Sequence, residues 1–165
     1  MAVVAMPSFG EFLKRVNLDS LRISVPFLSA EFRLSEADKA AAWDLYVELL
    51  TRVTTQHLLP EEGDEATALH SIHSLFATTR DILKRYGPST RRFAYLAIPV
   101  LNQMIRPFTA KWHGKIVADP NCFKLPEACS EFRRDLVELQ LGLRKYTFAL
   151  GVLAEVEDLS ALEAE

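Results

Sequence analysis

Apolar residues recur at alternating three- and four-residue spacing over long stretches of this chain, which is the period of an α-helix. The longest stretch keeps seven apolar residues on one line: Phe132, Leu136, Leu139, Leu143, Tyr146, Leu150 and Leu153. Pro126 precedes this line and is acceptable in the first turn of a helix, so a long helix is predicted to begin there. A helix with one apolar face needs other helices to cover that face.

A first helix is predicted after Ser35, which forms a capping box with Asp38 three residues later. We expect this helix to run to about Gln56. Its core-facing residues are predicted from the helical period: Ala42, Tyr46, Leu49 and Val53, with Trp43, Val47 and Leu50 widening the same face.

Two more helices are predicted between this segment and the last helix. Residues 64–86 form a helix that Asp64 caps and that Gly87 and Pro88 end. Residues 91–112 form another, which is apolar on most sides until Asn102 and should be the most buried. Four long helices with short connections are typical of an all-α, antiparallel four-helix bundle.

Residues 1–34 follow a different pattern. A short helix with one apolar face is predicted first, carrying Phe9, Phe12, Leu13 and Val16. An alternating pattern follows, as in an extended strand: Leu21, Ile23, Val25 and Phe27. Pro26 excludes a central strand, so we expect an extended strap that either packs on the bundle or docks on a partner. The chain is therefore divided into a strap (1–34), a bundle (35–156) and an acidic C-terminal tail (157–165).

Composition excludes several classes of protein. With 165 residues, of which 49% are hydrophobic, the chain can form one core without disulfides or a metal. Cys122 and Cys129 lack C-x-x-C spacing, so we expect free thiols in a reducing cytoplasm and no cofactor. No apolar stretch approaches the roughly twenty residues that cross a membrane, and no secretory signal is evident. A cytoplasmic protein with no membrane partner is expected.

Sequence motifs of common enzyme classes are absent. The glycines form no phosphate-binding loop, and no serine or cysteine stands in a hydrolase motif. His70 and His73 are three residues apart and could share a helix face, but no Glu stands three residues before any histidine, as di-iron bundle sites require. We predict no metal site.

Positive charge is concentrated in residues 80–115, which hold eight Lys or Arg and one Asp although the whole chain has a net charge of −3. This segregation suits an anionic partner, either RNA or an acidic protein surface, or self-association of unlike faces. Its simpler explanation is that bases gather at helix ends to complement the helix dipole. We name the residues about the Gly87–Pro88 turn the basic corner, a candidate binding surface: Arg80, Lys84, Arg85, Arg91 and Arg92.

A polar stripe crosses the apolar third helix. On a continuous helix, Asn102 and Arg106 share a face with His113, which lies seven residues after Arg106. Pro99 and Pro107 each remove a backbone N–H donor, so we expect a kink beside the stripe. The kink would expose polar backbone where a ligand or water can bind.

The Arg106-x6-His113 spacing on an all-α bundle resembles the ribonuclease motif of the HEPN superfamily. This resemblance implies a dimeric RNA-cutting cleft in which His113 is a general acid or base and Arg106 stabilises the phosphate charge. Alternatively, the stripe is an interhelical boundary, paired with acids such as Glu131 or Asp135. We expect a non-enzymatic interaction module, either a monomer or a dimer, that binds a protein or nucleic acid. The alternative function is a metal-independent endoribonuclease.

Overall fold

The computed structural model describes residues 8–23, 32–160 and 162, and this part of the chain is all-helical with no β-strand. The predicted all-α class is therefore confirmed. The α-helices are α1 (Phe9–Arg15), α2 (Glu36–Leu50), α3 (Glu65–Tyr86), α4 (Arg91–Val100), α5 (Arg106–Ala118) and α6 (Pro126–Ala154). Short 3₁₀ turns over Gly87–Thr90 and Cys122–Lys124 and a π-helical turn over Leu101–Ile105 connect them.

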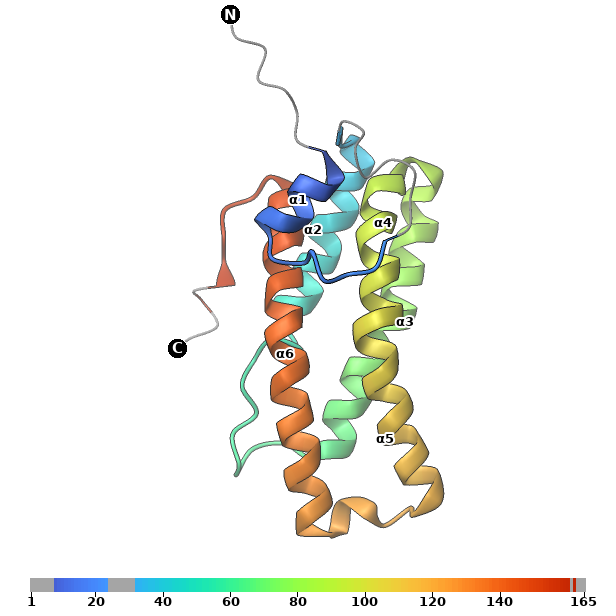
Figure 1. The fold of residues 1–165 in the computed structure, drawn as a ribbon, viewed down its shortest axis with the longest axis vertical. Helices are drawn as coiled ribbons and strands as arrows, with labels where there is room; N and C mark the ends of the chain where they lie inside the picture. Colours follow the sequence, from blue (N-terminus) through green and yellow to red (C-terminus); the bar gives the residue numbers. More distant parts are fainter. Residues whose placement is uncertain (1–7, 24–31, 161, 163–165) are drawn as a thin grey trace, which may run out of the picture.

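The longer helices alternate in direction along the long axis of the molecule. In Figure 1, α2 and the α4–α5 helix run downward while α3 and α6 run upward. α2 packs along α6 and also contacts α3 and α4, whereas α5 contacts α3 and α6. These contacts enclose one hydrophobic core. The division into strap, bundle and tail remains a prediction.

The apolar line of α6 lies in this core, as the helical period predicts. All seven residues of the line, from Phe132 to Leu153, are buried. The Phe132 ring meets the Trp112 ring of α5 edge to face, with 5.0 Å between ring centroids. Burying a side chain of this size stabilises the fold by about 1.5–3 kcal/mol. The α6 line therefore supplies much of the driving force for packing.

α2 ends at Leu50, so the prediction that this helix runs to about Gln56 is wrong. The hydroxyls of Thr54 and Thr55 both donate to the carbonyl of Leu49, at 2.9 Å each. A longer helix would use that carbonyl for its own backbone bond. Threonine side chains compete with the helix in this way, and the helix stops.

Two apolar side chains of α2 lie outside the core, contrary to prediction. Trp43 is 41% exposed and Val47 is 38% exposed. Leu45 and Leu49 are buried on the other side of the helix. An α-helix turns by about 100° per residue, so Trp43 and Val47 cannot share the core-facing side with these leucines.

The two prolines of the third predicted helix flank a π-helical turn. Pro99 lies inside α4, Pro107 lies in the first turn of α5, and Leu101–Ile105 is π-helical between them. The N–H of Arg106 donates to the carbonyl of Leu101, five residues earlier. The expected local distortion is therefore a widened turn, after which α5 continues. Such turns are frequent at functional sites.

The N-terminal helix α1 carries its predicted apolar face into the core. Phe9, Phe12, Leu13 and Val16 are all buried in the same hydrophobic cluster as the longer helices. Figure 1 places α1 near the end of α6 and the start of α2. The Phe9 ring centroid lies 4.9 Å from that of Phe32, which precedes α2.

The segment after α1 is tied to the π-helical turn. The Gln103 side chain accepts from the N–H of Arg22 at 2.8 Å and donates to its carbonyl at 2.7 Å. Leu21 is buried and Ile23 half-buried, without β-strand structure. The remainder of the predicted alternating segment, including Val25, lies outside the described residues.

Candidate anion-binding face

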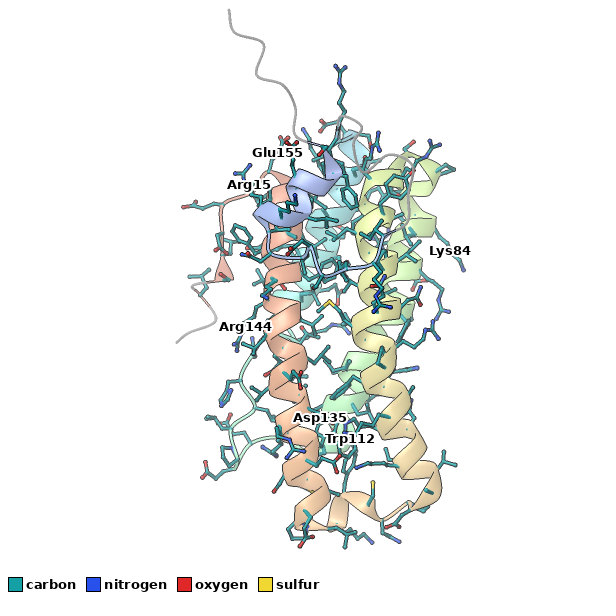
Figure 2. The ribbon with its side chains drawn as sticks, viewed as in Figure 1. Arg15, Lys84, Trp112, Asp135, Arg144 and Glu155 are labelled. Carbon is teal, nitrogen blue, oxygen red and sulfur yellow. The ribbon has the colours of Figure 1, made fainter. Side chains whose placement is uncertain are left out.

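α5 carries charged side chains on two sides, and the side facing α6 is paired. Lys111 lies 2.6 Å from Asp135 and 2.8 Å from Glu131, and Lys115 also pairs with Glu131. Trp112 Nε1 donates to the same Asp135 carboxylate at 3.1 Å (Figure 2). These lysines lower the pKa of Glu131 to about 2, because they donate hydrogen bonds to its ionised form.

Arg106 and His113 lie instead on the side of α5 that faces α3. The Arg106 guanidinium carbon is 5.1 Å from the centre of the Phe76 ring, and its Nε donates to Asn102 at 3.1 Å. The His113 ring centroid is 4.9 Å from that of His73. The expected pairing of Arg106 and His113 with acids of the last helix is therefore wrong, because lysines of α5 occupy those acids.

α3 carries basic residues along one side, and His73 on that side contacts His113 of α5. Asp64 caps α3 by accepting the N–H of Thr67 at 2.7 Å. One face then carries basic residues at helical spacing, and Lys84 projects outward from α3 in Figure 2. We name the α3–α5 basic face by six residues: His70, His73, Arg80 and Lys84 of α3 with Arg106 and His113 of α5.

No side chain of the α3–α5 basic face forms an ion pair with an acid among the described residues. The cationic side chains of this face therefore have no acidic partner there, and the pKa of His73 responds to them. Partial burial lowers the pKa of His73, and the nearby positive charges of His113, His70 and Arg80 lower it further. A bound anion would oppose these charges, so anion binding at this face should favour proton uptake.

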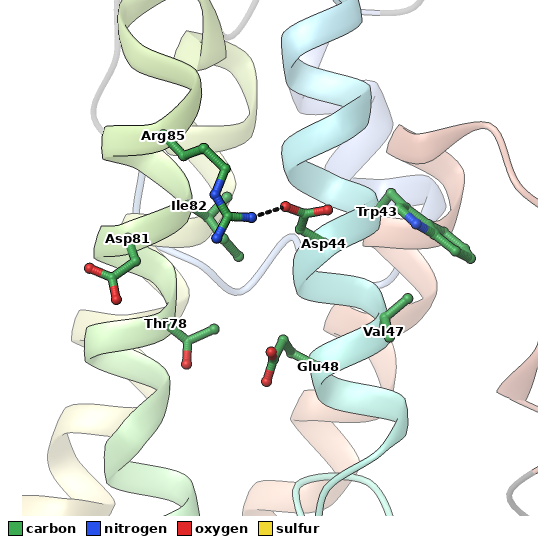
Figure 3. A pocket seen from close by; sticks show the side chains of 8 residues that line it. All are labelled: Trp43, Asp44, Val47, Glu48, Thr78, Asp81, Ile82 and Arg85. Atoms are coloured by element: carbon green, nitrogen blue, oxygen red, sulfur yellow. Dashed lines mark hydrogen bonds and ion pairs between the residues drawn. The ribbon is translucent and has the colours of Figure 1, made fainter.

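Arg85, a residue of the predicted basic corner, points away from this face. Its Nη1 lies 2.8 Å from the Asp44 carboxylate of α2, as Figure 3 shows. The Tyr86 hydroxyl donates to the same carboxylate at 2.9 Å. Arg85 and Asp44 both line a groove of about 380 Å³ between α2 and α3. The structure therefore separates Arg85 from Arg80 and Lys84.

Arg91 and Arg92 line a third location, an open basin of about 600 Å³ beside the start of α4. The Arg92 guanidinium carbon lies 5.8 Å from the centre of the Tyr95 ring. The buried Asp38 carboxylate also lines the basin and accepts the N–H of Phe93 at 2.9 Å. This carboxylate offsets part of the positive charge there.

His73 is the site residue that the sequence could not assign. Its three-residue spacing from His70 suggested a shared helix face, but only the packing of α3 against α5 brings it to His113. Within the described ranges, no three His, Cys, Asp or Glu side chains form a group that could hold a metal ion. The helices described there also include none with the length and apolar character needed to cross a membrane.

Comparisons of the chain with protein-family models, curated proteins and solved structures gave no match. The geometry of the α3–α5 basic face is therefore the basis for a functional proposal. Arg106 and His113 are part of that basis because they contact Phe76 and His73 of α3.

Proposed function

We propose that this protein is a non-enzymatic helical module that binds single-stranded RNA through the α3–α5 basic face. One observation carries the proposal: α5 has paired lysines on one side and basic residues without acidic partners on the other, within the described residues. RNA phosphates would supply the missing negative charge. We also infer that α2, α3, the α4–α5 helix and α6 form an antiparallel four-helix bundle that carries this face.

The ring contacts of the face favour RNA over an acidic protein surface. The Phe76 ring is half-buried, with the Arg106 guanidinium against it at 5.1 Å. An arginine plane and an aromatic ring are the surfaces on which unpaired bases stack. His73 adds a third flat side chain, since its ring centroid lies 5.7 Å from that of Phe76. An acidic peptide would contact only the charged side chains of the face and would make no use of the flat rings.

Fluorescence anisotropy with a labelled single-stranded oligoribonucleotide tests the proposal. The double variant Arg80→Gln/Arg106→Gln removes two charges from the face. Each lost phosphate contact weakens single-strand binding about fivefold at 0.1 M salt, so the loss of two should lower affinity about 25-fold. The matched control Lys111→Gln/Lys115→Gln removes the same net charge from the paired side and should bind nearly as well as the unmodified protein.

Two results would contradict RNA binding at this face. One is an equal loss of affinity in both double variants, which would indicate only a response to net charge. The other is displacement of RNA by polyglutamate at the same concentration of charge, which would identify the partner as an acidic protein.

A second candidate, metal-independent RNA cleavage, is favoured by the contact between His73 and His113. The lowered pKa of His73 favours its neutral form, so it would accept the proton of a 2′-hydroxyl attacking the adjacent phosphate. His113 would donate a proton to the departing 5′-oxygen, and Arg106 would stabilise the phosphate charge. The attack forms a 2′,3′-cyclic phosphate and breaks the bond to the 5′-oxygen.

Incubation of the purified protein with RNA in EDTA separates the two candidates. Cleavage that is lost in His113→Ala and in Arg106→Ala, with unchanged helicity by circular dichroism, would establish the ribonuclease. RNA binding without cleavage would support the non-enzymatic module.

A further inference from the structure

The outer face of α6 carries an exposed apolar stripe. Val137 is 43% exposed, Leu141 is 55% exposed and Phe148 is 46% exposed, whereas the opposite side of the helix is buried. Arg144 completes the stripe between Leu141 and Phe148. Exposed apolar residues that recur on one face of a long helix are typical of a contact surface.

The spacing of this stripe is the same in both directions. Its four members are separated by four, three and four residues. Two copies of α6 that pack antiparallel about a twofold axis, between Leu141 and Arg144, therefore align every member with another. Val137 lies opposite the partner subunit's Phe148, and Leu141 lies opposite the partner subunit's Arg144.

We propose that the protein forms a twofold-symmetric homodimer through the outer face of α6, with the two copies of this helix antiparallel. The Arg144 guanidinium donates to the carbonyl of Thr55 at 3.1 and 3.2 Å, beside the loop after α2. The aliphatic stem of Arg144 is then the part that meets the second copy.

Charge supports the antiparallel orientation. Glu138 and Lys145 are seven residues apart on one flank of the stripe, and both are exposed. Neither forms an ion pair within the described part of the chain. Antiparallel pairing places Glu138 beside the partner subunit's Lys145, twice in the dimer. In a parallel pair the equivalent flanks lie on opposite sides of the interface, so these two side chains would not meet their counterparts in the second copy.

The size of the stripe indicates a weak dimer. Val137 and Phe148 are eleven residues apart, which is about 17 Å along a helix. One helix face of this length is smaller than the roughly 800 Å² per partner of a standard stable interface. We therefore expect dimerisation at micromolar concentrations.

None of the six residues of the α3–α5 basic face lies on α6. The dimer therefore does not depend on RNA binding, and each proposal can fail without the other.

Sedimentation velocity of the full chain over 1–200 µM tests the dimer. The unmodified protein should shift from monomer to dimer within this range, and Leu141→Asp should remain monomeric. Val117→Asp is the matched control, because Val117 is 84% exposed on α5 and should leave the dimer unchanged. A protein that is monomeric at every concentration overturns the proposal, as does equal dimerisation by Leu141→Asp.

Disulfide cross-linking tests the orientation. A mixture of V137C and F148C should form a cross-linked dimer on oxidation, because only opposed residues bring their Cα atoms within about 7 Å. V137C alone should show no more cross-linking than the unmodified protein, whose Cys122 and Cys129 set the background. Cross-linking of V137C with itself, but not with F148C, would overturn the antiparallel arrangement.

Discussion

RNA binding by the α3–α5 basic face should weaken with salt at a rate set by its unpaired cations. Arg80, Lys84 and Arg106 carry permanent charge, and none pairs with an acid within the described ranges. Each neutralised phosphate of a single strand contributes about −0.7 to the slope of log K against log salt. Three contacts give a slope of about −2, so affinity should fall roughly twentyfold between 50 and 200 mM salt.

The same reasoning predicts a steeper slope in acid. When the histidines of the face are protonated, up to three more charges can meet phosphates, and the slope should approach about −4. The lowered pKa of His73 delays its contribution, so its charge appears at a lower pH than that of an ordinary histidine.

Anisotropy titrations at 50, 100 and 200 mM salt, at pH 7.5 and pH 5.5, measure these slopes. Arg106→Gln should make the slope at pH 7.5 shallower by about 0.7, whereas Lys111→Gln should leave it unchanged. The reasoning is refuted by a slope near zero in the unmodified protein, or by the same change of slope in both variants.

Three further predictions concern stability. Asp38→Ala removes the acceptor for the backbone N–H of Ser35 in the α2 capping box and leaves the buried N–H of Phe93 without an acceptor. Urea unfolding should therefore show a loss of about 2–4 kcal/mol, and a loss below about 1 kcal/mol would contradict this role. Glu131 has a folded pKa of about 2, so its stabilising charge is present above about pH 4.5 and is lost as the pH falls toward 2. In Glu131→Gln the melting temperature should therefore depend less on pH over that range. A dependence on pH equal to that of the unmodified protein would count against the pairing of Glu131 with the lysines. Gln103→Ala removes two hydrogen bonds to Arg22 and should cost about 1–2 kcal/mol by urea unfolding, while an unaltered midpoint would show that the tether is dispensable.

The helices could be predicted where they depend on local features of the sequence, namely apolar spacing and capping residues. The α6 line keeps strict three- and four-residue spacing, and all of it is buried. The start of α2 is set by Ser35 and Asp38, because the side chain of each accepts a hydrogen bond from the backbone N–H of the other. These hydrogen bonds are local and need no tertiary contact. The end of α2 was less predictable, because the hydroxyl of Thr54 competes with a helix that its neighbours would otherwise continue.

Features that depend on packing could not be predicted. Trp43 and Val47 fit a wide apolar stripe, yet they lie outside because the helices around α2 cover only its other side. The spacing of Arg106 and His113 indicated a shared face, but their neighbours on α3 depend on how two helices meet. The prolines indicated a distortion, and the choice of a π-helical turn over a simple kink is set by the surrounding structure.

The pKa of His73, followed by NMR with and without single-stranded RNA, tests the central claim most directly. Partial burial and the charges of His113, His70 and Arg80 lower this pKa in the free protein. Phosphates bound on the α3–α5 basic face would add negative charge beside the ring, so the pKa of His73 should rise when RNA binds. The signal of His57, in the loop after α2, should not move. RNA that binds while the pKa of His73 stays unchanged would contradict this location of the site.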